Sequence, residues 1–314
     1  MDRLVLKYIV AVFIIQFITA CGGESSTDSG PISPPQDGEL LFQSGFESNV
    51  VYENTHFRGI DQSEPPGIND WDKLPNYLDW MATQIGYVEG GNLALVQDPT
   101  DPTNRVLRLK NTREEGGHAR AQWSMWQADS WGDTGGQNIF DKQFYRQKMY
   151  IPAEIETLYS FSERSKWYMI WESHAWADDQ TRHGVYIKKD SNSNHWYFQV
   201  VQESPEGYQN VQWENTANRD VAVPFGEWFT FDVFFKYHDT DGAFYVAITT
   251  DDLGHQQVAN YRGKTKYGNK LFNQSVFKLY HDTDILNRMQ NLGFDGTTQY
   301  YDDFEIWSNF PPGY

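Results

Sequence analysis

The sequence of 314 residues contains a single cysteine, Cys21, which excludes an internal disulfide and a cysteine-based zinc site. Basic residues are also few, since 25 Lys and Arg stand against 43 Asp and Glu, giving a formal net charge of −18. Nucleic acids and anionic membranes need a basic surface, so non-specific binding to either is not expected. The apolar run at residues 8–20 is shorter than the roughly 20 residues of a membrane-spanning helix.

Several catalytic motifs are missing as well. The sequence has no Gly-x-Ser-x-Gly nucleophile elbow, no His-Glu-x-x-His zinc helix and no glycine-rich phosphate loop. It also lacks a Glu-x-Asp-x-x-Glu run, which would place both carboxylates of a retaining glycoside hydrolase on one strand. A hydrolase would therefore need carboxylates from separate segments, such as Glu172 with Glu203 or Asp178, to meet through folding.

The N-terminus has the layout of an export signal. Arg3 and Lys7 precede the apolar run, which ends at Ile18-Thr19-Ala20-Cys21. This tetrapeptide resembles the lipobox of bacterial lipoproteins, in which a cysteine after small residues is acylated and becomes the mature N-terminus. The resemblance implies a signal peptide at 1–20, a lipid anchor on Cys21, and a place in the bacterial cell envelope, at the outer membrane or cell surface. The alternative is an uncleaved anchor with an incidental cysteine.

The rest of the chain divides into a linker and one domain. Residues 21–40 are rich in Gly, Ser, Pro and Asp and have almost nothing to bury, so we expect a flexible tether. Residues 41–314 are interpreted as one domain, because β-sandwiches of roughly 200 to 250 residues are commonly single units. We expect this domain to be monomeric.

Alternating aromatic and β-branched segments, separated by Gly, Asp and Asn turns, recur along this domain and indicate strands. The clearest are Arg105 to Lys110, His118 to Trp126, Phe144 to Ile151, Trp167 to Trp171, Gly184 to Lys188, Trp196 to Gln202, Trp228 to Tyr237, Ala243 to Thr249, Ser275 to Tyr280 and Gln299 to Trp307. Short helices are expected at Trp71 to Tyr77 and Asp284 to Asn291, and an irregular stretch from Tyr52 to Gln97. This pattern predicts an all-β fold, a sandwich or jelly roll of two antiparallel sheets.

Aromatic residues make up 16% of this polar chain. Aromatic faces stack well on sugar rings, so carbohydrate is the first ligand class to consider, although a β-sandwich core also uses aromatics. In a jelly roll the first and last strands often lie side by side, which brings Phe46-Glu47 near Tyr301-Asp302-Asp303-Phe304. Glu47 and Asp303 could then hold a structural calcium, or they are simply solvated acids at strand ends.

Polar residues two apart recur in three of the expected strands, and residues two apart in a strand share a face. The groups are His118, Arg120 and Gln122; Glu172 and His174; and Lys278 and Tyr280. Each group alone is explained by a solvated sheet face. Together they supply donors that neutralise the carboxylate of a uronic acid, a base for its C5 proton and an acid for the leaving oxygen. Tyrosine can make both proton transfers if neighbouring cations stabilise its phenolate.

The order of these strands resembles the β-jelly-roll polysaccharide lyases, which include alginate lyases, heparin lyase I, and glucuronan and ulvan lyases. The matching segments are Arg120-Ala121-Gln122, Trp171-Glu172-Ser173-His174 and Phe277-Lys278-Leu279-Tyr280. The alginate lyases typically have Gln-Ile-His on the central strand, and they separate the late lysine and tyrosine by three residues instead of one. Because the alginate motif is imperfect, ulvan or a glucuronan is the favoured substrate, with alginate as a further candidate.

The resemblance implies a concanavalin-like jelly roll that cleaves an anionic, uronic-acid-containing polysaccharide by β-elimination, with no cofactor required for catalysis. Tyr280 would be the catalytic acid and base, His174 a partner base or neutraliser, and Arg120, Gln122 and Lys278 would hold the substrate carboxylate. Further candidates for substrate binding are Glu172, Lys166, Lys188, Arg262 and the tryptophans Trp126, Trp171 and Trp176. Two other functions fit the sequence: a non-catalytic surface glycan-binding lipoprotein, and a glycoside hydrolase of the laminarinase-like kind.

Overall fold

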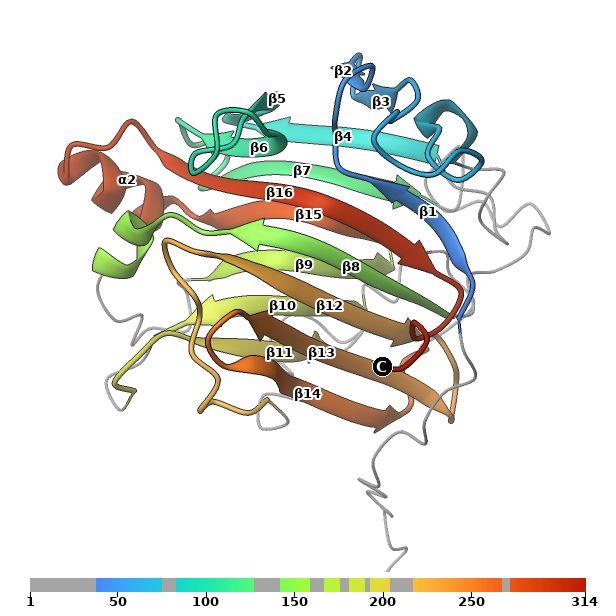
Figure 1. Cartoon of the computed structure of the whole chain (residues 1–314). Helices are drawn as coiled ribbons and strands as arrows, with labels where there is room; N and C mark the ends of the chain where they lie inside the picture. The colour runs from blue at the N-terminus through green and yellow to red at the C-terminus, as the bar shows by residue number, and fades with distance from the viewer. Residues whose placement is uncertain are drawn as a thin grey trace, which may run out of the picture.

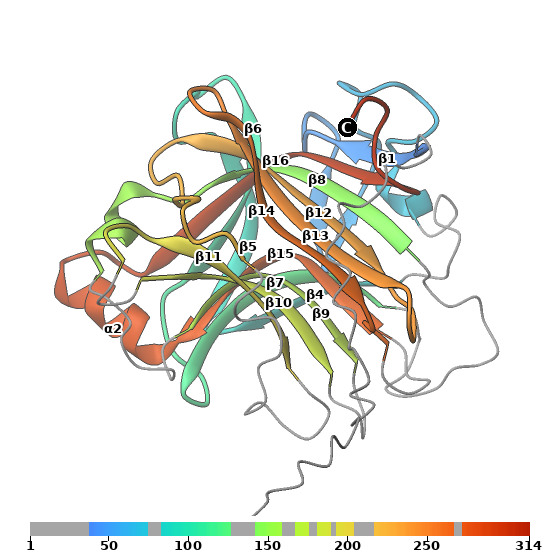
Figure 2. The ribbon, with the colours of Figure 1, turned by 90° about the horizontal axis from the view of Figure 1, so that it is seen from below.

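The computed structural model describes residues 38–74, 83–126, 142–158, 167–175, 181–189, 193–203, 217–266 and 272–314. These residues form two antiparallel β-sheets packed face to face (Figure 1). Figure 2 shows the two sheets from below as separate layers. The expected all-β sandwich of two antiparallel sheets, a concanavalin-like jelly roll, is confirmed.

The larger sheet has eight strands in the order β14-β13-β12-β8-β16-β6-β5, with β1 also paired to β16. Its strands are β1 (Leu40–Ser44), β5 (Gly91–Gln97), β6 (Arg105–Asn111), β8 (Lys142–Tyr150), β12 (Trp228–Lys236), β13 (Gly242–Thr250), β14 (Gly254–Gly263) and β16 (Thr297–Trp307). The smaller sheet has six strands in the order β11-β10-β9-β15-β7-β4. They are β4 (Thr83–Glu89), β7 (His118–Trp126), β9 (Tyr168–Ala175), β10 (Arg182–Lys188), β11 (Tyr197–Glu203) and β15 (Phe272–Asp282).

The remaining elements are short. They are the hairpin of β2 (Val51–Glu53) and β3 (His56–Arg58), the 3-10 turns η1 (Trp71–Lys73) and η2 (Ala153–Thr157), and the helix α2 (Thr283–Asn291). The Asp282 side chain caps α2 by accepting a hydrogen bond from the backbone N–H of Asp284. The predicted helix at Asp284 to Asn291 is therefore confirmed. Of the helix predicted at Trp71 to Tyr77, the described residues contain only η1, because 75–82 lie outside them.

The prediction of an irregular stretch from Tyr52 to Gln97 is wrong, because β4 and β5 lie within it. Strand β14 was not expected either. Strands β4, β5 and β14 are edge strands of their sheets, so each pairs with a single neighbour. A border strand is held largely by backbone hydrogen bonds, so its side chains need less of the alternation that identifies an inner strand.

The first and last strands lie side by side, as expected. Ser44 of β1 pairs with Phe304 of β16, whereas β6 pairs with the earlier part of β16, from Thr297 to Tyr301. One edge of β16 thus serves two partners. The pairing partner of this edge changes from β6 to β1 near Asp303. The φ of Asp303 is 45°, in the left-handed region, and it interrupts the regular strand.

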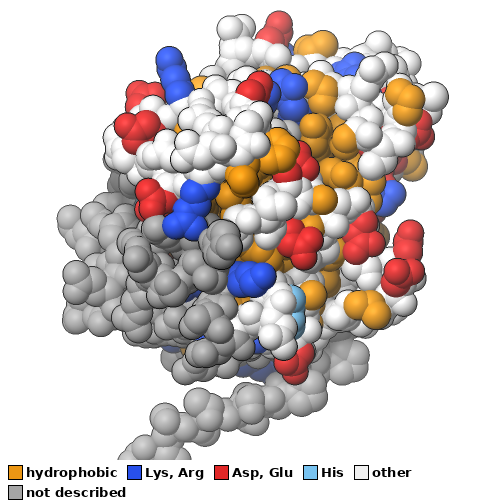
Figure 3. Space-filling view, turned by 90° about the vertical axis from the view of Figure 1, so that its left-hand side faces the viewer, with side chains coloured by type: hydrophobic (Ala, Val, Ile, Leu, Met, Phe, Trp, Pro, Cys, Tyr) orange, Lys and Arg blue, Asp and Glu red, His pale blue; other side chains and the backbone are white. Residues whose placement is uncertain are grey.

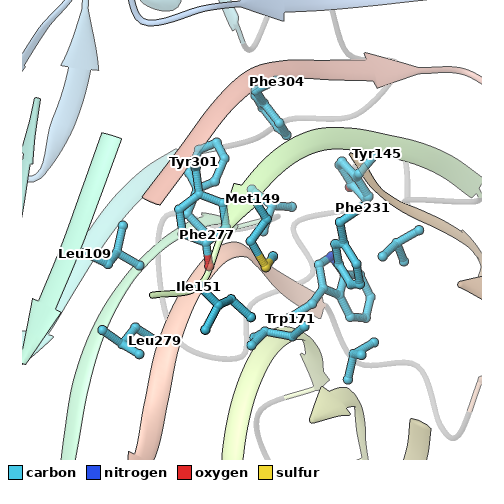
Figure 4. Close-up of a cluster of buried hydrophobic side chains, with 14 of the residues drawn as sticks. Leu109, Tyr145, Met149, Ile151, Trp171, Phe231, Phe277, Leu279, Tyr301 and Phe304 are labelled. Carbon is cyan, nitrogen blue, oxygen red and sulfur yellow. The ribbon is translucent and has the colours of Figure 1, made fainter. Parts of the chain in front are cut away.

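A continuous hydrophobic core fills the space between the sheets. Figure 4 shows part of it, with Phe231 and Tyr301 from the larger sheet facing Trp171 and Phe277 from the smaller one. Aromatic rings dominate this core, and ring contacts of this kind add to the free energy gained by burying their area. Much of the aromatic content therefore serves the core.

Trp71 joins the N-terminal segment to both sheets. Its ring is fully buried, and its centroid lies 4.6 Å from those of Phe42 and Phe57 and 5.4 Å from that of Trp123. Its indole N–H donates a hydrogen bond to Ser44 Oγ at 3.0 Å. Because Phe42 and Trp123 belong to different sheets, Trp71 closes one end of the core.

The surface is mixed in character. Figure 3 views the left-hand end of Figure 1 and shows patches of hydrophobic side chains bordered by acidic and basic ones. Among the described residues, no helix combines the length and the apolar character needed to cross a membrane.

We expect Trp71→Ala to lower the free energy of unfolding by about 3–5 kcal/mol, because it leaves a cavity and removes the hydrogen bond from the indole N–H to Ser44 Oγ. Equilibrium unfolding in guanidinium chloride measures this loss. The control Leu253→Ala removes a side chain that is 70% exposed and should change stability by less than about 0.5 kcal/mol. Equal losses in the two variants would contradict the role given to Trp71.

Candidate functional site

Polar side chains gather on the outer face of the six-stranded sheet, the face turned away from the larger sheet. Along β15 the apolar residues of the core alternate with Lys278 and Tyr280, which therefore point outward. Strand β7 pairs with β15 so that Gln122 lies opposite Lys278 and Arg120 opposite Tyr280. Two strands far apart in the sequence thus contribute to one surface.

Strand β9, on the other side of β15, contributes Glu172 and His174. The strand continues to Ala175, so these two residues share the outer face, as their spacing indicated. Glu172 contacts Lys278 directly, and its Oε1 lies 3.9 Å from Nδ1 of His174. His174 and Tyr280, which the lyase hypothesis needs on one face, therefore lie on the same face.

A buried network of charges occupies the centre of this face. The Lys278 ammonium, which has no exposed surface, binds the Glu172 carboxylate and donates to Gln122 Oε1 at 2.7 Å. On its other side, Glu172 Oε1 lies 2.5 Å from Nε of Arg182. A buried charge is costly unless it is paired and hydrogen-bonded, so these contacts are needed to keep Lys278 inside.

Tyr280 lies beside this network and is partly exposed. The guanidinium carbon of Arg120 is 4.4 Å from the centre of its ring, and the Lys278 nitrogen is 4.8 Å from it. The rings of Trp167 and His118 pack against it edge to face, at 4.3 Å and 5.2 Å between centroids. Tyr280 is thus held in position, with two cations close to its ring.

The charges of the network shift the pKa values of its members. Burial alone would raise the pKa of Glu172, but Lys278 and Arg182 lower it below the ordinary range of a glutamate. Burial lowers the pKa of Lys278, although Glu172 opposes this shift. Burial, together with the charge of Arg182, lowers the pKa of His174 to about 3. At neutral pH the site therefore holds an ionised Glu172 beside a neutral imidazole.

Sequence reasoning missed Arg182 as a member of this site and considered Glu203 only as a carboxylate partner of Glu172 in a hydrolase. Arg182, at the start of β10, contacts Glu172 and also lies 3.5 Å, through Nη1, from Oε2 of Glu203. The hydroxyl of Tyr186 donates to Glu203 Oε1 at 2.9 Å, and burial raises the pKa of Glu203. The predicted strand began at Gly184, and extending it by two residues would have placed Arg182 on the outer face.

The structure changes the interpretation of several other candidates. Lys278 and Gln122 bind each other and Glu172, so in this arrangement they are not free donors for a substrate carboxylate. Trp171 is wrong as a sugar platform, because it is fully buried and packs on Phe235 and Phe244 in the core. Its neighbour Glu172 points outward, so the alternation of a strand turns Trp171 inward.

The candidate cations are not gathered at this site. Arg262 lies exposed on β14, at the border of the other sheet, so it is wrong as a contributor to this face. Lys188 ends β10, six residues from Arg182. Lys166, Trp176 and Cys21, and the side chain of Trp126, lie outside the described residues.

The two carboxylates proposed for calcium have other partners. Glu47 Oε1 accepts a hydrogen bond from the backbone N–H of Arg105 at 3.0 Å, and Asp303 Oδ2 lies 2.7 Å from the Lys148 ammonium. Among the residues that the structure describes, no cluster of three or more His, Cys, Asp or Glu side chains is arranged to hold a metal ion. Calcium at Glu47 and Asp303 therefore stays a prediction.

No protein-family model and no curated protein matches the chain. Solved structures are similar in fold. An endo-β-1,4-glucuronan lyase from the fungus Trichoderma reesei is 17% identical with a TM-score of 0.43, over 71% of this chain and 91% of the other. An alginate lyase from Klebsiella pneumoniae is 10% identical with a TM-score of 0.41, over 70% and 85%. Lectin II from Ulex europaeus is 9% identical with a TM-score of 0.37, over 73% and 99%. At such identities the similarity concerns the fold alone.

The buried imidazole of His174 should make stability depend on pH. Its pKa of about 3 in the folded protein lies below that of an unfolded histidine, so the unfolded chain takes up a proton first. The contribution of His174 is therefore complete above about pH 6.5 and is lost as the pH falls toward 3. Lowering the pH from 7 to 5 should cost the wild type about 2 kcal/mol more than it costs His174→Gln.

Chemical unfolding of both proteins at the two pH values measures this difference. The buried residues His183 and His281, whose pKa values are also lowered by burial, are present in both proteins and cancel in the comparison. An identical pH dependence in wild type and variant would mean that His174 is not held neutral in the fold.

Proposed function

We propose that this protein is a polysaccharide lyase that cleaves a uronic-acid-containing polysaccharide by β-elimination on the outer face of the six-stranded sheet. The observation that carries the proposal is the surrounding of Tyr280, whose ring has the Arg120 guanidinium at 4.4 Å and the Lys278 ammonium at 4.8 Å. Nearby cations favour the anionic form of an acidic group, so this pair would stabilise a tyrosine phenolate. Such a phenolate is a base for the C5 proton of a uronic acid.

The reaction needs neutralisation of the substrate carboxylate as well as proton transfer. Arg120 is partly exposed and supplies the cation for this task, whereas Arg182 is paired with Glu172 and Glu203. Once the C5–H bond breaks, its electron pair forms the C4–C5 double bond and the C4–O bond breaks. The leaving oxygen then takes up a proton from Tyr280. No cofactor takes part in this scheme.

Lys278 acts through Tyr280 in this proposal. It is enclosed by Glu172 and Gln122, so it is a positioning residue that holds a positive charge near the tyrosine ring. His174 is neutral because its pKa is low, and a neutral imidazole can accept a proton. It is the partner base in the proposed site.

The substrate class follows from the local charge. Among the described side chains at the site, the cations Arg120, Arg182 and Lys278 outnumber the carboxylates Glu172 and Glu203, on a protein with a net charge of −18. An anionic polysaccharide suits such a surface. A glucuronan or ulvan is the favoured ligand, with alginate next, because the strand motif departs from that of the alginate lyases.

A second candidate function rests on Glu172 and Glu203. Both carboxylates contact Arg182, and the pKa of Glu172 is lowered whereas that of Glu203 is raised. Carboxylates with opposite shifts are the pattern of an acid and a base in a glycoside hydrolase. The products distinguish the two reactions, because hydrolysis leaves no double bond. A glycan-binding protein without catalysis would release no product at all.

The lipid anchor belongs to the same proposal. An acylated Cys21 would hold the domain in the bacterial cell envelope through a tether of about 20 residues, where extracellular polysaccharide is within reach.

The lyase is tested by incubating the protein with glucuronan, ulvan and alginate and following the ultraviolet absorbance of the new double bond. We expect Tyr280→Phe to lower the rate by a factor of about 10²–10⁴, because it removes the group that transfers the proton. The matched control Tyr245→Phe removes a hydroxyl that contacts His255 on the other sheet, and it should keep full activity. Normal elimination by Tyr280→Phe would refute this assignment of Tyr280.

The anchor is tested by expressing the full chain and Cys21→Ser in a bacterium and separating membranes from soluble protein. The full chain should sediment with the membranes and carry the mass of the added acyl chains, whereas Cys21→Ser should carry no acyl mass and leave the membrane fraction. Equal retention of both proteins would instead favour an uncleaved apolar anchor at residues 8–20.

A further inference from the structure

A second group of aromatic residues lies on the outer face of the eight-stranded sheet. Trp228 on β12 pairs with Tyr150 on β8, Tyr150 pairs with Tyr300 on β16, and Tyr300 pairs with Arg108 on β6. The four side chains therefore form a straight row across four neighbouring strands, and all four are partly exposed. With strands about 4.8 Å apart, the row is about 14 Å long.

The aromatic part of this row is held rigidly. The ring centroids of Tyr150 and Trp228 are 5.5 Å apart, and those of Tyr150 and Tyr300 are 5.9 Å apart. The Trp228 indole N–H donates to Thr100 Oγ1 at 3.1 Å and is also 3.3 Å from Asp98 Oδ1. Side chains fixed in this way lose little conformational freedom when a ligand binds.

Two other outward aromatic residues of the same face are covered. Phe234 and Tyr245 pack against Phe310 of the C-terminal segment, with ring centroids 4.4 Å and 5.4 Å away. Tyr314 of the same segment donates a hydrogen bond to the buried Asp232. The row of Trp228, Tyr150 and Tyr300 lies toward the α2 end of the sandwich and remains partly exposed.

The polar groups beside the row differ at its two ends. At one end Arg108 donates from Nη2 to Asn92 Oδ1 at 3.4 Å, so its charge is not neutralised by that contact. The neighbouring cation Lys110 is paired with Asp295 at 2.7 Å. At the other end the Asp98 carboxylate accepts hydrogen bonds from Thr100 and fixes Trp228. The row thus offers aromatic rings followed by one cation, with the carboxylates of Asp98 and Glu154 near the two tyrosines.

We propose that Trp228, Tyr150, Tyr300 and Arg108 form a second polysaccharide-binding site, on the face of the sandwich opposite the proposed active site. The neighbouring rings are tilted by 51° and 71°, so Trp228 and Tyr300, two strand spacings apart, present ring surface to alternate sugars. Arg108 binds the carboxylate of a uronic acid at the end of the row. Only the identity of the polysaccharide rests on the proposed function. Binding at this site does not require the protein to be a lyase.

Such a site would hold a long chain near the enzyme while another part of it, or another chain, occupies the outer face of the smaller sheet. Binding through two sites raises the effective concentration of the substrate. A polymer gains from this arrangement, whereas an oligosaccharide too short to reach both faces does not.

The test measures retardation of the mature chain in native gels containing glucuronan, ulvan or alginate, and the rate of cleavage of short oligosaccharides. The variants Trp228→Ala and Arg108→Ala should each weaken binding to the polymer by at least about tenfold, because they remove a ring anchor and the carboxylate partner. Cleavage of short oligosaccharides should be unchanged. Arg262→Ala is the matched control, since Arg262 is exposed on β14 of the same sheet, away from the row.

Arg108→Ala leaves the aromatic packing in place, so it tests the site even if Trp228→Ala lowers stability. Unchanged retardation by both variants would overturn the proposal, and so would a loss equalled by Arg262→Ala. If no polysaccharide is cleaved but Trp228→Ala and Arg108→Ala still weaken retardation, the lyase fails and the binding site stands. If cleavage occurs and retardation depends on Arg120 but not on Arg108, the lyase stands and the second site fails.

Discussion

The pairing of the Glu172 carboxylate with Lys278 and Arg182 is the interaction on which the outer face of the smaller sheet depends. Lys278 has no exposed surface, so its charge is tolerated only because Glu172 and Gln122 bind it. The same charge lies next to the ring of Tyr280. In our proposal Glu172 contacts no substrate. By holding Lys278 in place, it nevertheless sets the electrostatic surroundings of Tyr280, which does contact the substrate.

Aromatic residues serve different purposes in the core and on the outer face of the larger sheet. Between the sheets they fill the core, where Trp71 connects the N-terminal segment to both sheets. On the outer face of the larger sheet, one group is covered by Phe310 and another, around Trp228, stays partly exposed. The amino-acid composition does not distinguish the aromatic residues of the core from those on the surface. Their roles differ because burial, and not residue type, decides whether a ring meets solvent.

The inner strands were predictable and the border strands were not. The expected bounds of the strand at His118 to Trp126 agree with β7, because a strand packed on one face alternates strongly. Strand β14 carries mostly polar residues and pairs only with β13, so its sequence resembles a loop. At the site, Arg182 was missed because the strand was started two residues late, and Trp171 was misread although its outward neighbour Glu172 required it to point inward.

The sequence by itself determined the fold class and the sharing of faces, since the period of two along a strand is a local property. It placed Lys278 with Tyr280 and Glu172 with His174. Only the tertiary structure decided that β7, β15 and β9 are neighbours, and that Glu172 neutralises Lys278 instead of leaving it to a substrate. Strand neighbours are chosen by backbone hydrogen bonds and by the packing of the whole core. Neither can be recognised from any single segment of the sequence.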